Sequence, residues 1–440
     1  MAGRSIWNRG VISWSLYDFA NTIYSMNIAS NYVKRYLLDD LGYDDRYFDI
    51  PFSLSMILAG LLLPALGALS DRSTKKRLFV FLFTVSCCVS VLGMSLIPAG
   101  AIALLIMLFV ISNFSYEAAQ PFYNSLLYSV ADGKQARFVS GVGVALGYVG
   151  AILGVIIVLP FVTGDWFGYD VPFLDGDGKR GAFIPTAILF FAFALPLFLW
   201  VKERPVTMPS KASIKDAYRD VWHALKDTER YPGVLRFLIA DYFFEDAAAT
   251  VIINIGVYCS FVLAFTETEI TVFLTISPIA AVIGSVLIGK LAEVWSLRRT
   301  LQLVVIGWIL SLTAFVFTEN MTVVWILGSV VGVVLGGLWT TTRPMLAELV
   351  PREELGRFYG LFAMSGRAAA AVGPLVWTTI VLLFRPGTVL GDLVADALGL
   401  SAAEAEHLAY RAAILSLALM MAVGLFILRK VPVTRGDQNA

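Results

Sequence analysis

Long apolar runs constrain the fold of this 440-residue sequence more than any other feature. A helix that spans a bilayer needs about 20 mostly apolar residues. Charged residues make up only 15% of the chain, against about 25% in soluble domains. The sequence therefore predicts an all-α integral membrane protein of twelve transmembrane helices. The predicted spans are 11–37, 47–69, 78–98, 101–129, 138–162, 182–201, 234–264, 270–292, 300–318, 322–349, 358–384 and 408–429.

Several classes of function are disfavoured by composition. The net charge is zero, so no electrostatic preference for nucleic acid is expected. Both histidines, His223 and His407, fall in predicted loops, and the three cysteines, Cys87, Cys88 and Cys259, fall in apolar runs. This spacing indicates neither a metal site nor a disulfide framework. No nucleophile, base and orienting group recur at a useful spacing, so we expect neither an enzyme nor a cofactor.

Loop charges predict how the chain lies in the membrane. Cytoplasmic loops of membrane proteins are enriched in Lys and Arg. Alternate loops divide into a basic set, which we take as cytoplasmic, and an acidic set, so both termini are predicted inside, in a bacterial inner membrane. The basic set holds Arg72, Lys75, Lys76, Arg77, Lys134, Arg137, Arg298, Arg299, Arg352, Arg357, Arg429, Lys430 and Arg435. The acidic set holds Asp39, Asp40, Asp44, Asp45, Asp49, Asp165, Asp170, Asp175, Asp177, Glu267, Glu269, Asp392, Asp396, Glu404 and Glu406.

One long cytoplasmic connection divides the chain into two halves. We predict an N-terminal six-helix half at 1–201, a linker at 202–233 and a C-terminal six-helix half at 234–440. Apolar residues recur at helical spacing inside the linker, opposite basic ones. This pattern favours an amphipathic helix on the inner membrane surface or against the bundle; a solvated linker helix is the alternative. The apolar positions are Ile214, Tyr218, Val221, Trp222 and Leu225.

Each half begins with a helix that is interrupted by polar residues. The stretch Trp14–Thr22 carries Asp18 and Asn21, and the stretch Ala240–Thr250 carries three acids. Ionisable groups at membrane depth are costly and usually mark substrate or ion pathways. We therefore expect these two stretches to hold the functional residues.

A loop pattern that occurs in both halves points to a known family. Gly67–Arg77 follows the second span and Gly289–Arg299 follows the eighth, with Gly, Leu, acid and paired bases at the same spacing. The first copy resembles the signature loop of the major facilitator superfamily. That resemblance implies two six-helix pseudo-symmetric halves, with Asp71 and Arg72 as latch residues. The further gating candidates are Glu293, Arg137, Arg357 and Arg367.

A narrower resemblance extends over most of the chain. Tyr17–Asn21, Phe122–Leu127, Ser140–Gly150 and Phe358–Leu361 through Gly373–Leu375 are similar to the vacuolar-effluxer-like branch of the superfamily. Fungal members of that branch are linked to amino-acid efflux from the vacuole after autophagy. The sequence departs from the branch in helix seven, where Phe244–Ala247 stands in place of Tyr-x-Asp-Gly.

In the superfamily, helices one, four, seven and ten line the central cavity, and polar residues of this chain fall on them. Asp18 and Asp241 are expected roughly 10 Å from the cytoplasmic start of their helices, at about 1.5 Å per residue. Asn113 and Glu117 share one helix face, as do Asp241 and Glu245. The candidates for substrate or proton binding are Tyr17, Asp18, Asn21, Asn113, Glu117, Tyr123, Asn124, Asp241, Glu245, Asp246, Trp339 and Arg343.

These candidates favour a secondary transporter that works by alternating access. Acids outnumber bases among them, and crowded acids favour a protonated carboxyl near neutral pH. We therefore expect proton coupling and a small polar or zwitterionic solute, such as an amino acid or short peptide, with its amine on the acids and any carboxylate on Arg343. The expected partners are this small molecule, protons and the lipid bilayer, with a monomer as the functional unit. A purely structural ion pair of the Asp18–Arg343 type, an exporter of an amphiphile such as a lysolipid or drug, and a non-transporting membrane sensor are the alternatives.

Overall fold

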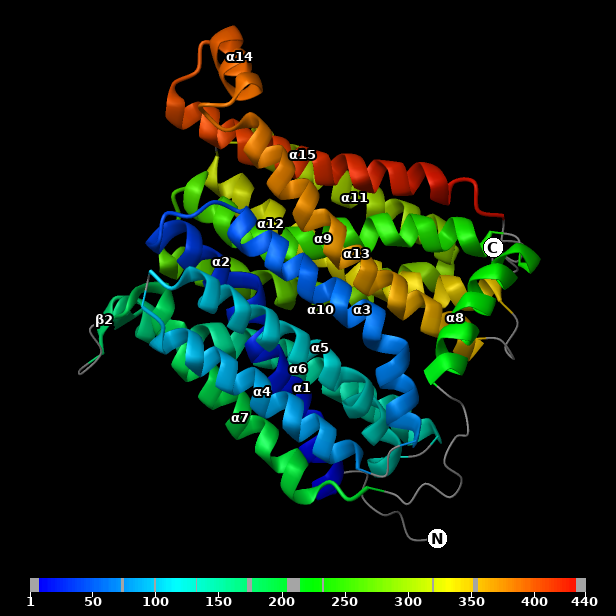
Figure 1. Ribbon diagram of the computed structural model, residues 1–440. Coiled ribbons are helices and arrows are strands. Elements are labelled where there is room, and N and C mark those ends of the chain that lie inside the picture. The colour runs from blue at the N-terminus through cyan, green and yellow to red at the C-terminus, as the bar shows by residue number, and fades with distance from the viewer. Residues whose placement is uncertain are drawn as a thin grey trace. The chain divides into compact units, whose positions relative to one another are not determined.

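The computed structural model describes residues 8–72, 75–98, 100–131, 133–171, 176–203, 214–231, 233–318, 320–350 and 355–432. Nearly all of these residues lie in helices (Figure 1). The chain forms two compact units, Met1–Tyr218 and Arg219–Ala440. The division between Tyr218 and Arg219 falls inside the predicted linker; the predicted ends of the two halves stay a prediction.

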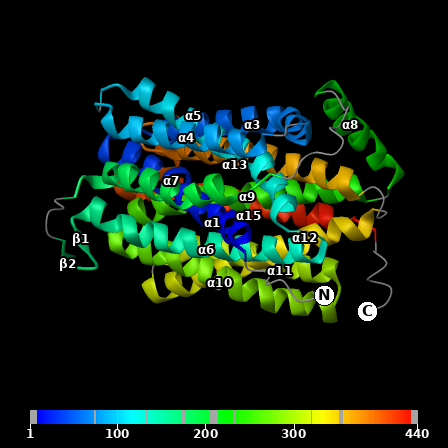
Figure 2. The same ribbon diagram turned by 90° about the horizontal axis from the view of Figure 1, so that it is seen from below.

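Unit 1 is built from six long helical segments. Its first segment is continuous from residue 9 to 40 and alternates between α-helix and π-helix. Short π-helical stretches are rare and occur often at functional sites. The elements are α1 (Arg9–Tyr24), η1 (Ser25–Tyr32), α2 (Val33–Arg35), η2 (Tyr36–Asp40), α3 (Arg46–Arg72), α4 (Lys76–Leu96), α5 (Ile102–Val130), α6 (Gly133–Thr163), β1 (Asp165–Trp166), β2 (Tyr169–Asp170), η3 (Gly178–Ala182) and α7 (Phe183–Trp200). The two short strands pair antiparallel and project beyond the ends of α6 and α7 (Figure 2).

Unit 2 repeats the pattern of six long helices and adds shorter ones. An amphipathic helix, α8, lies at the boundary of the units where the sequence predicts one. The elements are α8 (Ile214–Asp227), η4 (Thr228–Arg230), α9 (Val234–Phe261), α10 (Glu267–Val294), α11 (Leu297–Phe317), α12 (Met321–Leu349), α13 (Leu355–Phe384), α14 (Val389–Leu398) and α15 (Ala402–Leu428). Thr266 and Ser401 begin α10 and α15 with capping boxes, in which side chains bond the free N–H groups of the first turn.

Helix packing inside each unit follows one scheme. Counting the long helices of each unit as one to six, the first packs on the fifth and sixth, the fourth on the second and third, and the third on the sixth. In unit 1 these pairs are α1 with α6 and α7, α5 with α3 and α4, and α4 with α7. In unit 2 they are α9 with α13 and α15, α12 with α10 and α11, and α11 with α15. The repeat that the loop motifs predict is therefore also present in the packing.

Ten helices of the described chain are long and apolar enough to cross a membrane. The predicted spans outside this set are the first and the seventh, which correspond to residues 9–40 and to α9. The α-helical part of the first, α1, is only 16 residues long, because the segment continues as π-helix. Helix α9 carries Asp241, Glu245 and Asp246, and acids at membrane depth suit a helix that faces water or polar groups rather than lipid.

Some sequence predictions about loops are wrong. Helix α14 forms inside the segment that was expected to be a loop between the last two spans, and Thr388 caps it by accepting the N–H of Gly391. His223 lies in α8 and His407 in α15, not in loops. A short amphipathic helix is easily mistaken for a loop because its acids interrupt the apolar run.

Candidate functional site

The polar segment of α1, Trp14–Thr22, packs against α5 through aromatic side chains. The rings of Trp14 and Tyr123 stack with centroids 4.7 Å apart. The indole Nε1 of Trp14 donates to the carbonyl of Tyr123 (3.1 Å), and the Tyr123 hydroxyl donates to the carbonyl of Trp14 (3.0 Å). The Tyr17 ring lies 4.6 Å from the Tyr123 ring, and its hydroxyl bonds the hydroxyl of Thr84 on α4 (2.8 Å). Two predicted site residues, Tyr17 and Tyr123, therefore meet beside Asp18.

Asp18 is half-buried and hydrogen-bonds the Tyr123 hydroxyl. A phenolic hydroxyl has one proton to donate, and Tyr123 directs it to Trp14. A protonated Asp18 can donate to the Tyr123 oxygen, so both bonds form at once. An ionised Asp18 instead competes with the Trp14 carbonyl for one proton.

Glycines of α6 let that helix approach α1 closely. A Cβ at Gly143 would overlap the carboxylate of Asp18, and a Cβ at Gly150 would overlap the carbonyl of Phe19. Small residues of this kind allow close contact between membrane helices. Asp18 is thus close to both Gly143 of α6 and Tyr123 of α5.

The remaining unit 1 candidates do not gather around Asp18 in the same way. Asn21 is buried, and its Oδ1 has no hydrogen-bond partner among the described residues. Asn113 is buried and donates to the Ser55 hydroxyl of α3 (2.7 Å). Glu117 is half-buried and interacts with Tyr24 of α1, whereas Asn124 is exposed.

A second cluster joins α9 and α12 in unit 2. The indole Nε1 of Trp339 donates to Oε2 of Glu245 (3.1 Å). Arg343, one turn further along α12, acts electrostatically on both Glu245 and Asp241. Asp241 is fully buried, and neither of its carboxylate oxygens has a hydrogen-bond partner among the described residues. The structure therefore brings together four of the predicted residues, two acids, a guanidinium and an indole.

Asp246 faces a different helix from Asp241 and Glu245. Its Oδ1 accepts the backbone N–H of Gly373 on α13 (2.6 Å). A Cβ at Gly373 would overlap Asp246 and the hydroxyl of Thr250. Asp246 is fully buried. The acids of α9 therefore have neighbours on two different helices, Glu245 on α12 and Asp246 on α13.

The predicted gating residues lie mostly where side chains are not described. Asp71 and Arg72 end α3, while Arg137 and Arg357 lie in the first turns of α6 and α13; the side chains of all four fall outside the described residues. Glu293 is exposed near the end of α10. Arg367 is half-buried in α13 and has an interaction partner. The gating assignment stays a prediction.

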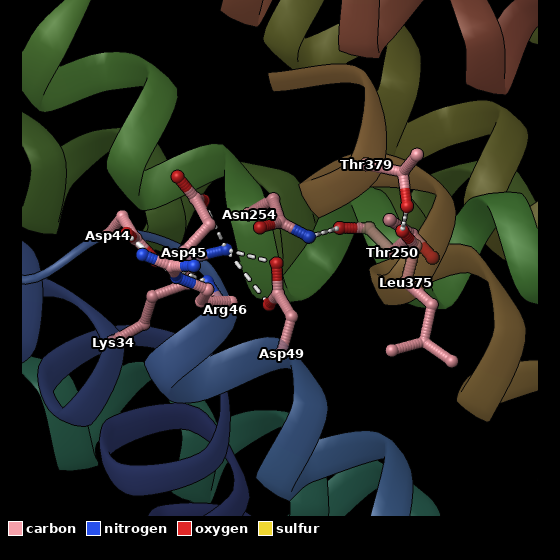
Figure 3. A network of polar contacts seen from close by, with 9 residues as sticks. All are labelled: Lys34, Asp44, Asp45, Arg46, Asp49, Thr250, Asn254, Leu375 and Thr379. Carbon is pink, nitrogen blue, oxygen red and sulfur yellow. Dashed lines mark hydrogen bonds and ion pairs between the residues drawn. The ribbon is translucent and has the colours of Figure 1, made fainter. Parts of the chain in front are cut away.

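Sequence reasoning missed a buried ion cluster in unit 1, at the far end of the first segment from Asp18. Lys34 forms ion pairs with Asp45 (2.7 Å) and Asp49 (2.8 Å), and all three side chains are buried (Figure 3). A second group joins this end to η3, directly before α7, where Lys179 pairs with Asp39 and Asp40. Two cations inside a run read as apolar, Lys34 and Arg35, were the signal for this cluster, since buried charges require partners.

Comparison with known proteins decides the family. The family described as "Vacuole effluxer Atg22 like" matches residues 128–382, which is more than half of the chain. The chain belongs to this Atg22-like family. A second family, described as "MFS/sugar transport protein", matches residues 11–138. The resemblance to the major facilitator superfamily is thereby confirmed, and the Atg22-like chain belongs among transporters, not enzymes.

Curated relatives of this Atg22-like chain come from bacteria and fungi. It is 24% identical over 390 residues to the uncharacterized MFS-type transporter YxiO of Bacillus subtilis, covering 87% of this chain and 91% of the relative. It is 23% identical over 362 residues to autophagy-related protein 22 of Kluyveromyces lactis, covering 74% and 72%.

Solved structures confirm the fold of the Atg22-like chain. A bacterial homolog of the human lysosomal transporter Spinster matches with a TM-score of 0.74 at 13% identity, covering 98% of each chain. The nucleoside transporter NupG matches with a TM-score of 0.73 at 14% identity, covering 96% of this chain and 98% of NupG. The all-α major facilitator fold that the motifs predict is therefore present.

Proposed function

We propose that this Atg22-like protein is a secondary active transporter that moves a small zwitterionic solute, such as an amino acid or short peptide, together with protons by alternating access. The observation that carries the proposal is Asp241, a fully buried carboxyl group with no hydrogen-bond partner among the described residues. A buried ionised carboxylate without a partner is strongly unfavourable. A proton or the ammonium group of a substrate relieves that cost.

The neighbours of Asp241 suit a zwitterion. Glu245 lies one turn along the same helix face and is held by Trp339 (3.1 Å). Two carboxyl groups offer acceptors for an ammonium group, which has three donors. Arg343 is exposed on α12, and its guanidinium can bind a carboxylate with two parallel hydrogen bonds. The amine of the solute is therefore assigned to Asp241 and Glu245, and its carboxylate to Arg343.

Asp18 is the proposed proton site. Its contact with Tyr123 depends on its protonation, because the Tyr123 hydroxyl has one proton and donates it to Trp14. Half-burial leaves Asp18 within reach of solvent for proton exchange. The same arrangement supports coupling, since ionisation would change the contact between α1 and α5.

The setting of the transporter is also part of the proposal. The distribution of loop charges supports two cytoplasmic termini. A relative in the bacterium Bacillus subtilis supports a bacterial membrane, which we take to be the inner membrane. Each unit contains its own polar cluster, which supports a monomer as the functional unit.

A thermal-shift screen of the purified protein tests the proposal. Amino acids, short peptides, sugars and lysolipids are added separately at mildly acidic and at neutral pH. We expect an amino acid or peptide to raise the unfolding temperature in a pH-dependent way, since a ligand stabilises the state that binds it. The stabilisation is lost in Asp241→Asn and kept in Asp396→Asn, an exposed acid on α14. Stabilisation by lysolipid alone, or by an amino acid equally in Asp241→Asn, would refute the proposed substrate site.

A further inference from the structure

Asp246 repeats the sequence setting of Asp18 but has a different neighbour. Each acid is followed four residues later by a threonine, Thr22 after Asp18 and Thr250 after Asp246. Each lies on the first helix of its unit, against a glycine of the fifth, Gly143 or Gly373. Asp18 bonds a side-chain hydroxyl, whereas Asp246 accepts a backbone N–H.

The backbone at Gly373 is a weak point of α13. Pro374 follows it directly and has no N–H, so the carbonyl of Ala370 receives no helical hydrogen bond from that position. Gly373 has no side chain to restrict its conformation. Its N–H donates to Asp246 across the helix interface. A carboxylate that accepts this N–H holds α13 at the residue where the helix is least rigid.

The space around this contact is fully occupied. A Cβ at Gly373 would overlap both the Asp246 carboxylate and the Thr250 hydroxyl. Elsewhere on α13, a Cβ at Gly366 would meet no atom within 4 Å. The close approach is thus specific to the position that faces Asp246.

We propose that Asp246 is a positioning residue that anchors α13 to α9 through Gly373, and that it does not bind the transported solute. Its second oxygen, Oδ2, has no partner among the described residues, so a proton can bind there without displacing the Gly373 bond. The solute binds instead to the face of α9 that carries Asp241 and Glu245; this assignment rests on the proposed function. The three acids of one helix thereby have two roles.

A double-mutant cycle tests the anchor without any substrate. Unfolding temperatures are measured for Asp246→Ala, Gly373→Ala and the double variant, with Gly366→Ala as the matched control. Residues in contact give non-additive effects. We expect each single change at the contact to lower the unfolding temperature, the control to leave it unchanged, and the double variant to lose less than the sum. Additive losses would overturn the anchor. Asp246→Asn keeps an acceptor oxygen and is expected to stay closest to the wild type, so a loss as large as that of Asp246→Ala would also overturn it.

A ligand readout separates anchoring from solute binding. The probe is an equimolar mixture of the proteinogenic amino acids, added to wild type, Asp246→Asn and Asp241→Asn. We expect the stabilisation to persist in Asp246→Asn and to disappear in Asp241→Asn. Its loss in Asp246→Asn at an unchanged unfolding temperature would make Asp246 a solute ligand and overturn the proposal. If the mixture does not stabilise the wild type, the proposed substrate is wrong, and the double-mutant cycle still decides the anchor.

Discussion

The first helices of the two units carry the same acid and threonine pattern and use it differently. Asp18 is half-buried and shares the hydroxyl of Tyr123, a group that can accept or donate. Asp246 is fully buried and accepts a main-chain N–H, a group that only donates. A carboxyl group whose partner can change with its protonation suits proton transfer, whereas one with a fixed donor suits anchoring. The two units thus carry an acid at the same place in the pattern, and the group that each acid contacts determines the role that we assign to it.

The largest expected loss of stability comes from the end of the first segment that lies away from Asp18, and the matching end of α9 provides the comparison. Lys34 in unit 1 is buried between Asp45 and Asp49, whereas Tyr258 in unit 2 hydrogen-bonds Arg411. Lys34→Met leaves buried carboxylates without their cation and is expected to cost about 3–5 kcal/mol of unfolding free energy. Arg411→Met removes a hydrogen bond to a neutral group and is expected to cost about 1–3 kcal/mol. Denaturant unfolding in detergent micelles measures both, and equal losses would contradict the contrast.

Alanine substitutions of Asp18 and Asp246 compare the contributions of the two acids to the free energy of unfolding. Asp246→Ala leaves the buried backbone N–H of Gly373 without this acceptor and is expected to cost about 1–3 kcal/mol. Asp18→Ala loses a bond to a hydroxyl that keeps its other partner, Trp14, and is expected to cost about 1 kcal/mol or less. The same unfolding assay compares them. A greater loss for Asp18→Ala would reverse the two assigned roles.

Substituting a glycine at the contact between α1 and α6 is expected to lower stability by an intermediate amount. Gly150→Ala places a methyl group against the carbonyl of Phe19, and overpacking of this kind costs about 1–3 kcal/mol. Gly141→Ala, on the same helix, meets no atom within 4 Å and is expected to change stability little. If the two substitutions behave alike in thermal unfolding, close contact of α6 with α1 is not needed for stability.

The smallest expected effect concerns the indole that holds Glu245. Trp339→Phe keeps an aromatic ring but removes the N–H donor, and a hydrogen bond of this kind contributes about 0.5–1.5 kcal/mol. Solute affinity is therefore expected to fall by up to about tenfold, as measured by titration calorimetry with the amino acid that stabilises the wild type. An unchanged affinity would show that the orientation of Glu245 does not matter for binding.

Much of the fold follows from patterns that a sequence displays locally. Apolar runs predict the spans 78–98 and 182–201, and the structure has α4 at Lys76–Leu96 and α7 at Phe183–Trp200. The first span ends later than predicted, at Asp40 and not at residue 37, because Asp39 and Asp40 form ion pairs with Lys179 that no local pattern displays. Helix α14 was missed because its ten residues include two acids.

Helical spacing alone accounts for part of the arrangement of the candidate site. Asp241 and Glu245 share a face because they are four residues apart, and Arg343 acts electrostatically on both. Asp246 contacts α13 and not α12 because α13 packs beside it and places Gly373 opposite its carboxyl group. No local sequence pattern shows which helices pack together or which residues face each other. The binding roles of these residues stay predictions.

Transport driven by a pH gradient tests the central claim most directly. Vesicles containing the protein are given an inward or outward proton gradient, and the movement of the stabilising amino acid is followed with a radioactive label. We predict that the wild type and Asp396→Asn respond to the gradient, whereas Asp18→Asn, inserted and folded equally well, does not. Gradient-driven transport by Asp18→Asn at the wild-type rate would contradict the account and remove Asp18 from the coupling mechanism.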